Sequence, residues 1–103
     1  GFIPSLRLMA FAQRSGLGCQ LGCQVGETGI LSAAGRHFAQ AVKGLEAVEG
    51  SFDRFLVGER LTLEDLTFGW GGKGQPLVGK GLGVTVDETA LKRVAVRQVV
   101  PHG

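Results

Sequence analysis

The chain contains no tyrosine and has little cysteine, proline and charge. Its 103 residues include one tryptophan, two cysteines and three prolines, and only 19% of them are charged. The hydrophobic share of 44% excludes a disordered chain, because disordered chains are polar and highly charged. A chain of this length is long enough for one domain at most. We therefore expect a small globular unit with a thin margin of stability.

Long apolar runs and clusters of basic residues are also absent. No run approaches the roughly 18 apolar residues that a membrane-spanning helix needs, and the first residues lack the pattern of a secretory signal. The eleven basic and nine acidic residues are scattered, and the longest basic run is Lys92-Arg93. A nucleic-acid-binding protein would carry a basic patch. The sequence thus predicts neither a membrane protein nor a nucleic-acid-binding protein.

The two cysteines, Cys19 and Cys23, lie four residues apart. On an extended strand their Cα atoms would be separated by roughly 13 Å, whereas a disulfide needs them within about 7 Å. We therefore expect free thiols and a cytoplasmic location.

Glycine is abundant, with 18 residues where average usage of about 7% would give far fewer. Glycine loses the most backbone entropy on folding, so we expect a chain rich in loops. The first residue is Gly1 and not methionine, which suggests a processed, cloned or truncated chain.

The first part of the chain predicts a helix, a strand and a second helix. Residues 5–14 follow a start signal in which Ser5 would be the N-cap. Residues 17–25 form a short apolar run, typical of a strand buried on both faces of a parallel sheet. Residues 30–43 carry apolar side chains at helical spacing, with Gly44 ending that helix.

Later elements are predicted from weaker patterns. Residues 45–60 show little periodicity and indicate a connection. A strand over 61–68, a turn at 70–74 and a return strand over 75–78 would form a hairpin. Asp87 would cap a helix at 88–93, and a last strand is expected at 94–100.

This order predicts an α/β fold in which the first half of the chain, a helix, a strand and a helix, is one repeat of a (β/α) barrel. Residues 1–46 would be that repeat, with the strand leading to Glu27, and residues 47–103 a return segment with the hairpin and the short helix. One barrel strand cannot satisfy both of its edges alone, which indicates that further strands lie outside this sequence.

Glu27 is the candidate catalytic residue. It follows the expected strand and precedes the expected helix, and in a barrel such junctions form the face that carries active sites. A carboxylate there can accept a proton or bind a substrate. Equally, a glutamate at this position can serve only to stabilise the helix start. His37 lies on the apolar stripe of its helix, which favours a packed, hydrogen-bonded histidine over a catalytic base.

Two glycine-rich segments mimic nucleotide-binding loops but lack essential parts. In the segment from Gly74 to Gly81 the residue after Lys80 is glycine, whereas a phosphate-binding loop needs Ser or Thr there and a helix to follow. The segment from Gly16 to Gly22 has the wrong glycine spacing for a dinucleotide loop. No Cys/His/Asp cluster has the spacing of a zinc site.

Residues 5–42 resemble the last barrel repeat of the enolase superfamily, in its mandelate racemase and muconate lactonizing branch. The shared pattern is a helix, a short strand, Glu27, and a helix with His37 ten positions later. The stretch GKGLGVTVDETAL, residues 79–91, is similar to that branch's C-terminal signature, although the family has a proline-glycine pair where Lys80-Gly81 stands here. The resemblance covers roughly residues 5 to 91.

The resemblance implies a Mg²⁺-dependent isomerase or lyase that abstracts a proton α to a carboxylate. It implies that Glu27 lines the substrate site or assists electrophilically, and that the neighbours Gln24, Thr28 and Gly29 contact the substrate. The lysine bases and the metal ligands would come from earlier strands, so no metal ligand is expected here and the isolated chain should be inactive. The implied partners are a small carboxylate substrate, the rest of the barrel, the capping domain and further copies of the full-length enzyme.

A second hypothesis remains open at this point. A small, glycine-rich α/β module without catalytic activity could act by association through exposed apolar edges.

Overall fold

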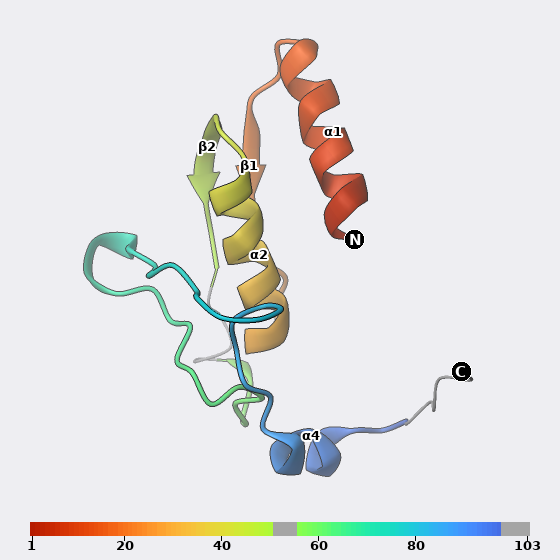
Figure 1. Cartoon of the computed structure of the whole chain (residues 1–103), viewed down its shortest axis with the longest axis vertical. Helices are drawn as coiled ribbons and strands as arrows, with labels where there is room; N and C mark the ends of the chain where they lie inside the picture. The colour runs from red at the N-terminus through yellow and green to blue at the C-terminus, as the bar shows by residue number, and fades with distance from the viewer. Residues whose placement is uncertain (51–55, 98–103) are drawn as a thin grey trace.

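The computed structural model describes residues 1–50 and 56–97 of the chain (Figure 1). Helix α1 (Phe2–Arg14) is followed by strand β1 (Cys19–Leu21), helix α2 (Gly29–Ala41) and strand β2 (Leu45–Val48). The 3₁₀ turn η1 (Trp70–Gly72) and helix α4 (Glu88–Val94) come later. The α/β class is therefore confirmed.

Helix α1 begins three residues earlier than predicted, and Ser5 is not its N-cap. Gly1 occupies the N-cap position, and both the backbone N–H and the Oγ of Ser5 donate to Gly1 O, at 3.1 and 3.0 Å. Pro4 is tolerated because it lies in the first turn, where a missing N–H has no helical partner to lose. The predicted end is confirmed, since Ser15 is the C-cap.

The strands β1 and β2 pair in parallel and form a two-stranded sheet, with α2 as the connection between them (Figure 1). The prediction of a strand in a parallel sheet is confirmed, but β1 covers only three of the nine predicted residues. The sheet is not buried on both faces as expected, because Gln20 and its partner Ala47 expose one of them. Strand β2 lies in the segment predicted to be a connection. The predicted boundary after residue 46 falls inside this strand.

Helix α2 forms as the apolar spacing predicts, with Ala33 and Phe38 buried. Its small residues allow close packing, since an added Cβ at Gly35 would lie 3.9 Å from the Leu21 side chain. The ring of Phe38 meets that of Phe2 edge-on, with centroids 5.8 Å apart. Helix α2 thus packs against both β1 and the start of α1.

The predicted hairpin does not form. Neither 61–68 nor 75–78 is a strand, and the described part of this region has only one isolated antiparallel bridge, between Thr62 and Val86. The turn itself exists, because Gly69 N–H donates to Lys73 O at 2.8 Å, but its flanks do not pair as a ladder. Glycines with positive φ flank the segment 75–78, with Gly71 at +69° in the turn before it and Gly79 at +125° directly after it.

Helix α4 confirms the prediction for 88–93, and Asp87 caps it by accepting from Ala90 N–H at 2.9 Å. The expected strand at 94–100 begins inside this helix and does not appear at residues 95–97; its remainder, from residue 98, lies outside the described residues. Ala90 joins Leu61, Thr62 and Leu66 in burial.

Two neighbouring side chains of α2 hold the later part of the chain. Arg36 Nη2 donates to Leu66 O at 2.5 Å and Nη1 to Gln75 O at 3.2 Å. His37 Nε2 lies 2.9 Å from Leu82 O, a hydrogen bond in the tautomer that carries its proton on Nε2. The prediction that His37 is a hydrogen-bonded packing residue is confirmed.

Candidate functional site

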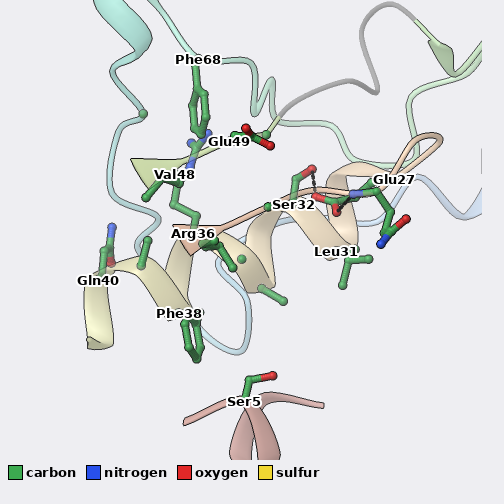
Figure 2. Close-up of a pocket in the computed structure, with 18 of the residues that line it drawn as sticks. Ser5, Glu27, Leu31, Ser32, Arg36, Phe38, Gln40, Val48, Glu49 and Phe68 are labelled. Atoms are coloured by element: carbon green, nitrogen blue, oxygen red, sulfur yellow. Dashed lines mark hydrogen bonds between the residues drawn. The ribbon is translucent and has the colours of Figure 1, made fainter. Parts of the chain in front are cut away.

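A cavity of about 590 Å³ lies between α1, α2, the ends of β1 and β2, and residues 68–74 (Figure 2). It is large enough for a small organic ligand. Polar side chains line it alongside apolar ones, so a ligand with both characters would fit. The polar residues are Ser5, Gln24, Glu27, Ser32, Arg36, Gln40 and Glu49, and the large apolar residues are Phe2, Leu21, Leu31, Phe38, Val48 and Phe68.

Glu27 lies in the loop that joins the carboxyl end of β1 to the start of α2. Its Oε1 accepts a hydrogen bond from Ser32 Oγ at 2.9 Å, and its Oε2 accepts one from Gln24 N–H at 3.2 Å (Figure 2). A turn closed by Glu27 N–H and Gln24 O at 3.0 Å, with Gly26 at φ +80°, brings these groups together. The nearby N-terminus of α2 favours the negative charge.

The other residues predicted to contact a substrate fall into two groups. Gln24 lines the cavity next to Glu27. Thr28 and Gly29 lie outside the lining: Thr28 is the N-cap of α2, without a side-chain capping bond, and Gly29 is buried against the side chain of Thr62. The cavity therefore brings together two of the four predicted site residues, and Gly29 has a packing role.

Glu49 was missed by the sequence analysis. It directly follows β2, and its N–H donates to Leu21 O at 2.8 Å, which extends the parallel pairing by one step. The carboxyl ends of parallel strands lie at the same edge of a sheet, so Glu49 lines the cavity that Glu27 lines. The one available signal was the short run 45–48 after the helix-ending Gly44, which fits the strand–helix–strand order.

Arg36 brings a cation to the wall of the same cavity. Its guanidinium lies 5.3 Å from the centre of the Phe68 ring, within range of a cation–π contact. Burial lowers the pKa of Arg36 from its ordinary value, because desolvation disfavours the charged form. Within residues 1–50 and 56–97, its buried Nε has no hydrogen-bond partner. Its two other nitrogens are committed to backbone carbonyls, so Arg36 mainly holds the 66–75 loop against the cavity.

The remaining residues considered for special sites lie as follows. Cys19 and Cys23 are both free thiols, as expected. The described residues hold no group of three or more His, Cys, Asp or Glu that is arranged to bind a metal ion. Lys80 lies in an irregular stretch, and the next helix in the described part begins only at Glu88. No helix in that part of the chain is long and apolar enough to span a membrane.

Comparison with known proteins adds one finding. A family model described as enolase C-terminal domain-like matches residues 1–90 of the chain. No significant match exists among curated proteins or among solved structures. Every residue that lines the cavity falls within the matched range.

Proposed function

Because the chain belongs to the enolase C-terminal domain-like family, we propose that it is the C-terminal part of an enolase-superfamily isomerase or lyase. Such an enzyme, in the mandelate racemase and muconate lactonizing branch that residues 5–91 resemble, removes a proton α to a carboxylate. The observation that carries this proposal is the family match across residues 1–90, which includes Glu27 in the loop after a parallel strand. In barrel enzymes such loops build the active site.

The open sheet supports a place within a larger barrel. In the described residues β1 and β2 pair only with each other, so each strand has one edge without a partner strand. Exposed Gln20 and Ala47 mark a sheet face that α2 does not cover. Unpaired edges are normally protected in natural proteins, and closing a barrel removes them. We propose that further strands of the same enzyme pair with these edges, so that β2, and not β1, is the last strand of the barrel in this chain.

Within this proposal Glu27 contacts the reacting end of a small carboxylate substrate, and Gln24 helps to orient it. Glu49, at the end of the neighbouring strand, contacts another part of the substrate and so contributes to specificity. The apolar wall that includes Leu31 and Phe38 receives the substrate's carbon skeleton. Dipeptides, N-acylamino acids, muconate, a succinylbenzoate precursor and sugar acids are the substrate classes to test.

The residues at positions 1–50 and 56–97 do not suit Mg²⁺ by themselves. Mg²⁺ demands near-octahedral oxygen coordination, usually with one or two carboxylates and several waters. Both oxygens of Glu27 already accept hydrogen bonds from Ser32 and Gln24. We therefore assign the metal ligands and the lysine bases to other parts of the proposed enzyme, and no step of this chain's chemistry is derived through the metal.

The first step of the test is to sequence the transcript upstream of the Gly1 codon. The longest protein encoded by that transcript is then expressed, and the exchange of the α-proton of each candidate substrate with deuterium is followed by NMR with and without Mg²⁺. We expect Mg²⁺-dependent exchange, and a loss of at least about 100-fold in Glu27→Gln, the typical size of one electrostatic contact at the reacting end of a substrate. Glu46→Gln is the matched control, since Glu46 lies on β2 but does not line the cavity.

Three outcomes contradict the proposal. Exchange that survives Glu27→Gln would remove the role of that carboxylate. Turnover by the 103 residues alone would refute the claim that this chain carries only part of the active site. A transcript that begins near Gly1 would instead favour the second candidate, an interaction module. The observation that favours this candidate is the exposure of two large apolar residues, Trp70 at 98% and Val78 at 84%.

A further inference from the structure

Ser32 makes a contact that the expected helix chemistry does not require. It lies in the first turns of α2, where its backbone N–H already makes the helical bond to Thr28 O at 3.0 Å. Serine hydroxyls within helices commonly turn back to the carbonyl four residues earlier. The Ser32 hydroxyl donates instead to the carboxylate of Glu27, five residues earlier, at 2.9 Å.

That hydrogen bond is one of two that Glu27's carboxylate accepts. Ser32 approaches Glu27 Oε1 from the helix, while Gln24 N–H approaches Oε2 from the loop. The two donors thus reach opposite oxygens of the same group from different elements. The contact between Ser32 and Glu27 is partly buried, and Figure 2 shows it at the side of the cavity where both residues form the lining.

A free glutamate side chain has several rotatable bonds and samples many orientations. A catalytic or binding carboxylate must be held near its productive orientation by neighbours that are themselves fixed. Ser32 meets this requirement, because it is anchored in a helix whose Ala33 and Phe38 are buried.

We propose that Ser32 is a positioning residue: its hydroxyl, together with Gln24 N–H, fixes the orientation of the Glu27 carboxylate at the cavity. The claim that this orientation matters for catalysis rests on the proposed function. The positioning itself is a property of the 103 residues and can be measured on them.

The experiment measures hydrogen exchange of the Gln24 amide by NMR in the full chain. In Ser32→Ala the Glu27 carboxylate loses one of its two hydrogen bonds and is free to rotate away from Gln24 N–H. The hydrogen exchange of the Gln24 amide should then accelerate about threefold, the scale of a weak net hydrogen bond. Ser32→Thr keeps the hydroxyl and should preserve the wild-type exchange rate. The amide of Phe38, within α2, is the internal control and should stay protected, because alanine is a better helix former than serine.

A double-mutant cycle separates positioning from a general loosening of the structure. In a Glu27→Ala background the carboxylate is gone, so adding Ser32→Ala should leave the Gln24 exchange unchanged. The inference is refuted if Ser32→Ala has no effect in the wild-type background, or if it has the same effect with and without Glu27. Either result leaves the enzyme assignment standing. Conversely, a longer protein without α-proton exchange would refute that assignment while the Gln24 response remained.

Discussion

The N-terminal region, residues 1–50, and the C-terminal region, residues 56–97, are held together in different ways. The first is built from two helices and two paired strands, so repeating backbone hydrogen bonds supply most of its order. The second has one 3₁₀ turn, one seven-residue helix and an isolated bridge in its described part. Its order comes from backbone bonds between residues 61–63 and 85–87 and from single side chains that reach distant backbone groups.

The difference shows how a glycine-rich chain can have a defined structure with few regular elements. Arg36 and His37, both on α2, bind carbonyls of residues 66, 75 and 82. Within the C-terminal region, Glu64 accepts from Thr85 N–H at 2.7 Å. Each of these bonds links segments far apart in the sequence. The C-terminal region therefore depends on α2 and on a few residues, and single substitutions should affect it strongly.

The largest effect is expected at Leu66, which is only 2% exposed. Leu66→Ala leaves a cavity in the small core of the C-terminal region and should reduce the free energy of unfolding by about 2–5 kcal/mol. Urea unfolding followed by circular dichroism measures this loss. Leu63→Ala is the matched control, because Leu63 is 64% exposed and should change stability by less than about 0.5 kcal/mol. Equal effects at the two positions would mean that this region has no core of its own.

A middle-sized effect is expected at the junction of the two regions. Arg36→Met keeps much of the apolar stem but removes both hydrogen bonds to the 66–75 loop, at an expected cost of about 1–3 kcal/mol. Because Trp70 is the single tryptophan and lies in that loop, its fluorescence anisotropy should fall as the loop is released.

Arg36→Lys tests whether the fork of the guanidinium matters. Lysine keeps the positive charge but has one ammonium group, which cannot bond Leu66 O and Gln75 O in the same planar geometry. It should lie between wild type and Arg36→Met in both stability and anisotropy. Unchanged anisotropy in Arg36→Met would show that other contacts hold the loop.

The smallest effect concerns pH. The backbone hydrogen bond from Thr85 lowers the pKa of Glu64 below its ordinary value of 4.5. A carboxyl group whose pKa is depressed in the folded state adds stability that is fully present above its ordinary pKa and is lost as the pH falls through the lowered one. Glu64→Gln should therefore destabilise the chain near neutral pH and differ less from wild type in acid.

Unfolding measured across pH 2 to 7, a range of about five units that spans the ordinary glutamate pKa, checks this expectation. Glu88→Gln is the control, since Glu88 is exposed and its ion pair with Lys92 is long, at 4.0 Å. A constant difference between Glu64→Gln and wild type over the whole range would contradict the assigned role of the carboxylate.

The sequence by itself determined the helices, the free cysteines, the packing role of His37 and the superfamily. Helix α2 was predictable because its apolar spacing is a local pattern, and α4 because Asp87 is a local cap. The resemblance at Glu27 and residues 79–91 was also a property of short motifs, and the family match over residues 1–90 confirms it at the level of the enolase superfamily.

Only the tertiary structure decided strand β2, the path of the C-terminal region and the full lining of the cavity. Strand β2 exists because β1, more than twenty residues earlier, offers it a parallel edge. The short run 45–48 is a local signal for a strand, but it does not identify the partner strand. The position of Glu49 in the cavity follows from that pairing alone. Arg36 holds the two ends of the irregular 66–75 loop, and side-chain contacts across 30 and 39 residues leave no periodic trace in a sequence.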